Sequence, residues 1–264
     1  VRAPAFVAYL QQERFDEAVN FPNPRGDGTL SVLLRPYGEG MKLVLSQDIT
    51  DRERNEAMRR DFVANVSHEI RTPLTVLAGA VETMAQLPLS EGERQRVLSL
   101  MQQQTSRMQA LVTDLLTLAQ LEGSPRPPVD QWVAVHGLMS AVRADALALS
   151  AGRHRIECGG SEDAELAGNE QELLSAFGNL LTNAVRYTPE GGTVRATWSW
   201  RAEGGGAFEV RDSGIGIARE HLPRLFEHFV QIETAPSRRF EGAGLGLAIS
   251  RQLVGRMGGS ITVD

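Results

Sequence analysis

The chain has 264 residues, a formal net charge of −6 and 42% hydrophobic residues, enough for two domains or three small ones. Its pI near 5.5 and the lack of any Lys/Arg cluster argue against nucleic acid as a partner. The single cysteine, Cys158, excludes an intrachain disulfide and fits a reducing compartment. No apolar run approaches the roughly 18–20 residues that span a bilayer, and because the chain opens on Val1 we expect a soluble piece of a longer protein.

The first fifty residues predict a small mixed segment. Helices are expected around Phe6–Leu10 and Phe15–Val19, and strands over Leu30–Arg35 and Met41–Ser46, with a Gly-containing turn between the strands that makes them a hairpin. So short a segment buries little core alone. We therefore expect residues 1–50 to be the C-terminal part of a larger sensor domain.

A charged stretch, Arg52–Arg60, runs without a helix breaker into an amphipathic helix. The apolar stripe of this helix recurs at steps of three and four residues: Met58, Phe62, Val66, Ile70, Leu74, Leu77, Val81 and Met84. At about 100° per residue, His68 points away from the stripe and into water. Thr72 shares its face, and Glu69 can lean toward the imidazole.

A histidine, a carboxylate and a hydroxyl on one exposed turn resemble a phosphate-accepting site. An imidazole nitrogen is a better nucleophile when a carboxylate holds the N–H of the other nitrogen, and Glu69 is the candidate for that role. An isolated His-Glu pair is more often an ordinary surface pair. The interpretation therefore depends on motifs further along the chain.

A second long helix is expected from Ser90, which caps it with Glu93 three residues later, to Leu121. Two striped helices joined by a short loop form an antiparallel hairpin over residues 51–122, and one hairpin leaves much apolar surface uncovered. Two copies that pair as a four-helix bundle would cover it, so the sequence predicts a homodimer. Residues 123–129, rich in proline, predict a linker.

Residues 130–264 predict an α/β domain. Its expected helices and strands are His136–Leu149, Arg155–Cys158, Glu165–Ala167, Glu170–Tyr187, Thr193–Trp200, Ala207–Arg211 and a strand that opens at Ile261. Glu203–Gly206 is the expected turn of the last complete hairpin.

One face of the predicted helix ending at Tyr187 is polar, since Asn179, Asn183, Arg186 and Tyr187 fall at relative positions 0, 4, 7 and 8. Two amides, a guanidinium and a phenol suit phosphates and Mg²⁺ at one end and a stacked base at the other. An asparagine oxygen is a hard neutral ligand that Mg²⁺ accepts. Asn-x-x-x-Asn alone is weak evidence, because exposed asparagines on helices are common.

Two glycine-rich segments follow. The first, after a predicted strand, contains Asp212, Gly214 and Gly216; the second, which opens a helix, contains Gly242, Gly244, Leu245 and Gly246. The glycines allow close backbone approach, a buried Asp212 carboxylate could accept from an adenine amine, and the free N–H groups of a helix start bind phosphate. Neither segment has the dinucleotide-binding spacing or a Gly-Lys-Ser/Thr, so those nucleotide-binding folds are disfavoured.

These motifs, in this order, resemble the sensor histidine kinases of two-component systems, and among them the phosphate-regulon branch. The matching segments are a phosphoacceptor box, an asparagine box, a first glycine box, a phenylalanine box and a second glycine box, at Phe62–Thr75, Asn179–Thr188, Asp212–Ile217, Leu225–Phe229 and Gly242–Leu247. The resemblance implies an α+β multidomain fold: a partial PAS-like segment, a dimeric antiparallel helical hairpin, and an α/β sandwich ATP-binding domain of the Hsp90, gyrase and histidine-kinase type.

The resemblance also implies roles on the hairpin. His68 would be autophosphorylated from ATP and pass the phosphoryl group to an aspartate of a response regulator. Glu69 would assist it, and Thr72 would orient water when the protein dephosphorylates that regulator.

For the nucleotide, the resemblance implies that Asn183 coordinates Mg²⁺, Tyr187 packs on adenine and Asp212 binds its amine. Asn179 stands where the Hsp90- and gyrase-type ATPases carry a glutamate base, so ATP would be kept for an external nucleophile. Other expected partners are regulators linked to phosphate transport, and an inner-membrane anchor beyond the N-terminal end of the chain.

The sequence departs from the family pattern near the nucleotide. Arg186 replaces the usual lysine, which keeps the charge and changes the geometry. Three further positions, which carry an arginine, a tyrosine and an arginine in the family pattern, are here His228, Val230 and Gln231. In the lid that follows, Arg238 and Arg239 are candidates to contact the γ-phosphate, and the alternative is that they are solvated loop charges. His136, His154 and His221 are expected to be surface or capping residues.

Two alternatives stay open. One is an ATP-hydrolysing machine of the Hsp90 or gyrase type, against which Asn179 and His68 argue. The other is a noncatalytic scaffold that binds nucleotide and a partner.

Overall fold

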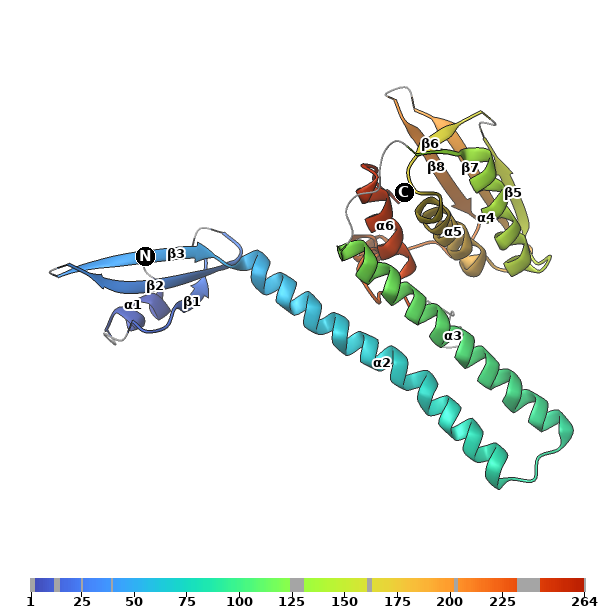
Figure 1. Ribbon diagram of the computed structural model, residues 1–264, viewed down its shortest axis with the longest axis horizontal. Helices are drawn as coiled ribbons and strands as arrows, with labels where there is room; N and C mark the ends of the chain where they lie inside the picture. Colours follow the sequence, from blue (N-terminus) through green and yellow to red (C-terminus); the bar gives the residue numbers. More distant parts are fainter. Residues whose placement is uncertain are drawn as a thin grey trace. The chain divides into compact units, whose positions relative to one another are not determined.

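The structure is a computed structural model that describes residues 3–11, 15–24, 26–38, 40–123, 131–160, 163–201, 204–231 and 243–263. The chain divides into two compact units, Val1–His68 and Glu69–Asp264. The helix α2, Thr50–Gln86, runs through the boundary between them (Figure 1).

The first unit contains α1 (Pro4–Gln11) and an antiparallel sheet of β1 (Val19–Pro22), β2 (Thr29–Tyr37) and β3 (Met41–Asp48), in that order. The expected β2–β3 hairpin is confirmed. The helix expected at Phe15–Val19 is wrong, because Val19 begins β1 and pairs with Val32 of β2. Strand pairing places Phe21 in the core beside Phe6, at 5.8 Å between ring centroids, and outweighs a local helical pattern of five residues.

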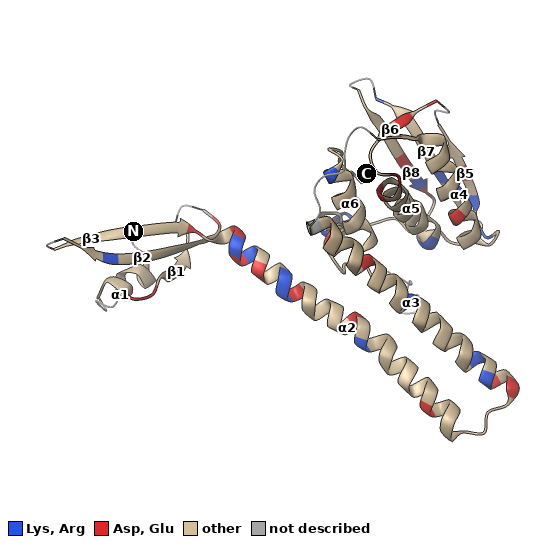
Figure 2. Cartoon of the chain, in the orientation of Figure 1, with Lys and Arg blue, Asp and Glu red and all other residues tan. Residues whose placement is uncertain are grey.

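Thr50 fixes the junction between this sheet and α2. Its hydroxyl accepts a hydrogen bond from Thr29 N at 2.9 Å, and Asp48 accepts one from Thr50 N at 3.0 Å. Hydrogen bonds from the Thr50 hydroxyl and backbone lower the pKa of Asp48. Figure 2 shows that charged residues of both signs gather along the first turns of α2. The helix continues through Pro73 without interruption.

The second helix of the hairpin, α3 (Glu91–Gly123), begins with the predicted capping box. Glu93 Oε2 accepts from Ser90 N at 2.9 Å, and Ser90 Oγ accepts from Glu93 N at 3.4 Å. Hydrogen bonds from Ser90 lower the pKa of Glu93. Residues 124–130, which include most of the expected linker, lie outside the described residues.

Part of the predicted apolar stripe is uncovered in a single chain. Leu74 is 49% exposed and Val81 is 54% exposed on α2, and Val112 is 47% exposed on α3. Pro73, Ala80, Leu111, Leu118 and Leu121 are buried. One chain therefore covers only some of the apolar surface of its own hairpin.

The rest of the second unit is an α/β domain. Its elements are β4 (Trp132–Ala134), α4 (Val135–Ser150), β5 (Arg155–Gly159), β6 (Glu165–Ala167), α5 (Glu170–Tyr187), β7 (Thr193–Trp200), β8 (Gly206–Asp212), η1 (Arg219–Arg224) and α6 (Gly246–Arg256). In the sheet β5-β7-β8, β5 is parallel and β8 antiparallel to β7, and α4 and α5 pack against one face (Figure 1). A second, two-stranded sheet pairs β4 with β6.

The structure differs from the sequence prediction at both ends of this domain. β4 was not predicted, because three residues show no periodicity. The strand expected at the chain end does not form over the described residues 261–263.

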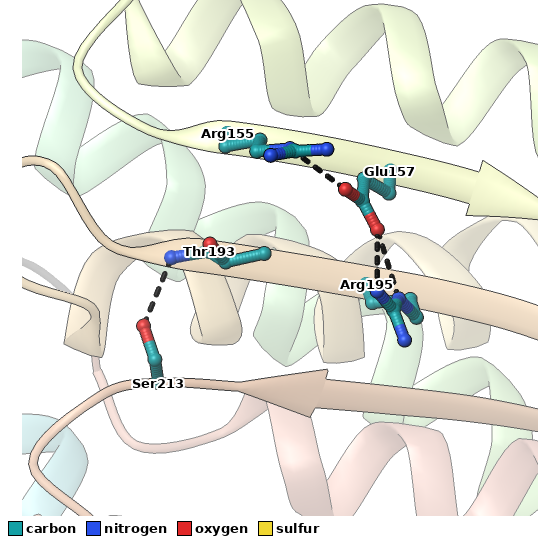
Figure 3. A network of polar contacts seen from close by, with 5 residues as sticks. All are labelled: Arg155, Glu157, Thr193, Arg195 and Ser213. Carbon is teal, nitrogen blue, oxygen red and sulfur yellow. Dashed lines mark hydrogen bonds and ion pairs between the residues drawn. The ribbon is translucent and has the colours of Figure 1, made fainter.

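Polar contacts join the three strands of the main sheet, as Figure 3 shows. Glu157 binds Arg155 at 2.7 Å and Arg195 at 2.8 Å, and the hydrogen bond from Arg195 is the main cause that lowers the pKa of Glu157. Ser213 Oγ accepts from Thr193 N at 2.9 Å, while Ser213 N donates to Thr193 O at 3.0 Å. Ser213 thus fixes the turn that follows β8.

Candidate functional site

A cavity of about 1780 Å³ in the second unit gathers most of the predicted nucleotide residues. Its lining includes Asn179, Asn183, Arg186, Tyr187, Asp212, Gly214, Gly216, Gly244 and Gly246. Because ligand pockets usually measure about 300–1,000 Å³, this cavity is a wide cleft with room for a nucleotide and a second group.

Helix α5 lines the cleft and has one apolar and one polar face. Leu173, Ala176, Phe177 and Leu181 are buried, and the Phe177 ring stacks on Phe208 of β8 at 4.0 Å between centroids. Asn169 caps the helix, since its Oδ1 accepts from Gln171 N at 3.0 Å and Glu172 N at 3.1 Å. The four polar residues of the predicted face line the cleft, and so do the apolar residues Leu173, Ala176 and Phe177 of the same helix.

The two asparagines have different surroundings. Asn179 Nδ2 donates to Gly246 O at 3.2 Å, which joins α5 to the start of α6. Among the described residues no hydrogen bond engages the Asn183 side chain. The Asn183 amide oxygen is therefore available to a ligand.

The positive charge of Arg186 acts on two titratable groups that line the cleft, Tyr187 and Asp114. Burial raises the pKa of Tyr187 and the pKa of Asp114, and the positive charge of Arg186 opposes both shifts. Asp114 comes from α3 and lines the same cleft.

Asp212 is at the cleft, but it is exposed rather than buried as the sequence interpretation supposed. It ends an edge strand of the sheet, where Gly214 N donates to its Oδ1 at 2.8 Å. A Cβ on Gly214 would lie 2.6 Å from Tyr187 O, so only glycine lets this turn close on the end of α5.

The second glycine segment folds back on the phenylalanine box. Gly244 has φ +69°, and a Cβ there would lie 2.8 Å from Val230 O. Phe229 N donates to Gly244 O at 3.0 Å. The Leu245 side chain is fully buried and does not line the cleft, while Gly242, Arg238 and Arg239 lie outside the described residues.

His68 and Thr72 are exposed on α2, in agreement with the helical pattern. The carboxylate of Glu69 binds Arg107 of α3, at 2.9 Å between Oε2 and Nη2. Glu69 and Arg107 both line the cleft that contains the candidate nucleotide-binding residues. The sequence analysis missed Arg107 and Asp114, because polar residues on a long helix give no local signal of what they face.

The three histidines that were expected to be surface or capping residues have ordinary surroundings. His154 contacts Thr188 O at 2.9 Å and Ser150 Oγ at 3.1 Å, and His221 lies 3.6 Å from Glu220. His136 is exposed at the start of α4. None of these arrangements indicates a ligand.

The donor set fits Mg²⁺ that arrives with a nucleotide. Over the described residues no group of three or more His, Cys, Asp or Glu side chains could hold a metal ion. Mg²⁺ often keeps waters and phosphate oxygens and takes one or two protein ligands, which is what Asn183 offers.

None of the helices in the described part of the chain is long and apolar enough to cross a membrane.

Two family models match the chain. Residues 58–124 match the His Kinase A (phospho-acceptor) domain, and residues 168–264 match the histidine kinase-, DNA gyrase B- and HSP90-like ATPase.

Curated relatives match nearly the whole chain. The phosphate regulon sensor protein PhoR of Pseudomonas aeruginosa is 44% identical over 96% of this chain and 58% of its own length. The sensor histidine kinase WalK of Bacillus subtilis is 32% identical over 97% of this chain and 42% of its own length. The chain thus spans about half the length of these relatives.

Solved structures agree on the fold. The kinase ThkA, in complex with the response regulator TrrA, superposes with a TM-score of 0.57 at 17% identity, over 98% of this chain and 79% of that one. The full-length kinase ShkA, in complex with AMPPNP, gives a TM-score of 0.52 at 30% identity, over 75% of this chain and 41% of that one.

Proposed function

Because the chain belongs to the sensor histidine kinases of two-component systems, we propose that it phosphorylates His68 from ATP and passes the phosphoryl group to an aspartate of a response regulator. The observation that carries this proposal is the shared cleft. Its lining includes the polar face of α5, both glycine segments, and Glu69, which follows His68 directly in the chain.

In the proposed reaction an imidazole nitrogen of His68 attacks the γ-phosphorus of ATP. A P–N bond forms as the bond to the β-phosphate oxygen breaks, and ADP leaves with that electron pair. The imidazole's other nitrogen then gives up its proton, and we assign Glu69, the next residue in the chain, as the acceptor. Mg²⁺, when bound through Asn183, neutralises charge on the phosphates.

For the nucleotide, Tyr187 is proposed to pack on the adenine ring and Asp212 to accept from its amine. The exposed position of Asp212 in the cleft is compatible with that contact. The free N–H groups at the start of α6, with Gly244 and Gly246, would receive phosphate. A carboxylate base is lacking at Asn179, which bonds to Gly246, so ATP is held for His68 and hydrolysis is disfavoured.

Thr72, one turn after His68 on the same face, is proposed to orient water when the protein dephosphorylates its regulator. The high identity to a phosphate regulon sensor supports a phosphate-responsive pathway, with regulators linked to phosphate transport as further partners. ThkA, which shares the fold, has been seen with a response regulator.

We also propose a homodimer. The exposed apolar residues Leu74, Val81 and Val112 lie on the hairpin, and a second copy would cover them in a four-helix bundle. The match of residues 58–124, which form most of the hairpin, to the phosphoacceptor family model supports this proposal.

The proposed organisation follows the sequence expectation. Residues 1–50 would be the end of a PAS-like sensor domain, residues 51–122 the linker helix and hairpin, 123–129 a linker, and 130–264 the catalytic domain. By analogy with the relatives, the chain would be the cytoplasmic portion of an inner-membrane protein.

Incubation with Mg²⁺ and ATP labelled at the γ-phosphate distinguishes this function from the two alternatives. A kinase retains the label on protein, with little phosphate released. Continuous phosphate release without protein label indicates an Hsp90- or gyrase-type ATPase. ATP binding with neither label nor phosphate release indicates a scaffold, and either of these last two results contradicts the proposal.

A further inference from the structure

The ion pair between Glu69 and Arg107 joins the two helices of the hairpin immediately beside the phosphoacceptor. Arg107 Nη2 lies 2.9 Å from Glu69 Oε2, and the two side chains are only 30% and 22% exposed. Both side chains therefore lose freedom to make this contact, and the hydrogen bond is charge-assisted, which makes it stronger than a neutral one.

The pair commits the Glu69 carboxylate to Arg107. Successive residues of a helix point about 100° apart, and Arg107 draws the Glu69 carboxylate toward α3 while the His68 side chain is exposed. The guanidinium also offsets part of the negative charge that would stabilise a positive imidazole. A carboxylate held in this way assists His68 less than a free one.

We propose that Arg107 is a positioning residue that competes with His68 for Glu69, and so holds the hairpin in a state of low kinase activity. The inference rests on the proposed function. Any shift of α2 against α3 that separates the two side chains would release Glu69 to the imidazole. Since α2 continues unbroken from the sheet of the first unit, a signal there has a direct route to this contact.

The test compares initial rates of His68 phosphorylation in the intact chain. Arg107→Gln should raise the rate about two- to tenfold, the range that one partly buried ion pair supplies, at an unchanged KM for ATP. Arg107→Lys, which retains the charge, should stay near the wild-type rate. Arg96→Gln, an exposed arginine on the same helix, is the matched control.

The decisive comparison uses Glu69→Gln. In that background Arg107→Gln should have no further effect, because no carboxylate is left to release. A slower Arg107→Gln enzyme would show that Arg107 supports Glu69 and would overturn the proposal. An equal acceleration with and without Glu69 would assign Arg107 a merely structural role and would also overturn it.

A second readout needs no kinase activity. Diethyl pyrocarbonate acylates nucleophilic imidazoles. Arg107→Gln should therefore raise the rate at which His68 is acylated and leave the rate at which His136 is acylated unchanged. Mass spectrometry follows both rates. Equal His68 rates in both proteins contradict the proposal. A wild-type chain that reacts as expected here, yet takes no label from ATP, contradicts the proposed function and leaves the competition for Glu69 supported.

Discussion

Each predicted nucleotide residue in the cleft has a separate physical task. Asn179 ties α5 to α6 through Gly246, whereas Asn183 lines the cleft and its side chain is engaged by none of the described residues. Asp212 holds a tight turn with Gly214 and still has a second oxygen for a ligand. The two asparagines are therefore not equivalent, although they share one helical face.

Asn183→Ala should weaken binding of Mg-ATP by about tenfold or more, because it removes the proposed metal ligand, and should have a much smaller effect on ATP without Mg²⁺. Titration calorimetry with and without Mg²⁺ measures both. Gln171→Ala, on an exposed turn of the same helix, is the control and should bind as wild type. Equal losses with and without the metal would assign Asn183 to the nucleotide instead.

Asp114 should make the stability of the protein depend on pH. Its pKa is raised by burial, against the attraction of Arg186. A carboxyl whose pKa is higher in the folded than in the unfolded protein stabilises the fold below its unfolded pKa, and this contribution is lost as the pH rises through the folded pKa. Asp114→Asn has no carboxyl to ionise, so its stability should not fall over this pH range. At neutral pH it should unfold at a higher urea concentration than wild type.

Urea titrations across acidic to neutral pH test this, with the exposed Asp61→Asn as control. A neutral-pH stability of Asp114→Asn equal to or below that of wild type would mean that the attraction to Arg186 outweighs the cost of burial.

At the scale of helices and strands, the sequence predicted those elements that short-range interactions along the chain determine. The capping box at Ser90, the long helix through His68 and the β7–β8 hairpin follow from periodicity, caps and turn residues. β1 and β4 depend on pairing with distant strands, and a short segment does not reveal such pairing.

The residues of the candidate site also fall into two groups, those that local spacing predicts and those that depend on packing between elements. The face of α5 is a matter of helical spacing, so its residues could be placed in advance. The exposure of Asp212, the burial of Leu245 and the pairing of Glu69 with Arg107 depend on how separate elements pack, which one sequence does not show.

Helix α5 should depend on its cap. Asn169→Ala removes the acceptor for two backbone N–H groups and should lower the free energy of unfolding by about 1 kcal/mol. Asn169→Ser, which can still accept, should recover most of it. Urea unfolding followed by circular dichroism measures both variants. An Ala variant as stable as the Ser variant would show that tertiary packing alone determines where α5 begins.

At the scale of the whole molecule, the proposed homodimer would cover the exposed apolar residues of the hairpin. Leu74 and Val81 are seven residues apart on one face of α2, and both are about half exposed. Charges placed there should prevent a four-helix bundle from forming. Leu74→Glu with Val81→Glu should therefore convert the dimer to a monomer in sedimentation equilibrium.

Leu147→Glu, at a 45% exposed position on α4, is the control and should leave the dimer intact. A double variant that still sediments as a dimer would locate the interface elsewhere.

The most direct test of the account is the chemistry of the label on His68. The intact chain and His68→Gln are incubated with Mg²⁺ and ATP labelled at the γ-phosphate, and the labelled protein is exposed to acid and to base. We predict an acid-labile, base-stable label that is absent from His68→Gln, although that variant still binds nucleotide. A label that persists in His68→Gln, or one that survives acid, would contradict His68 as the phosphoacceptor.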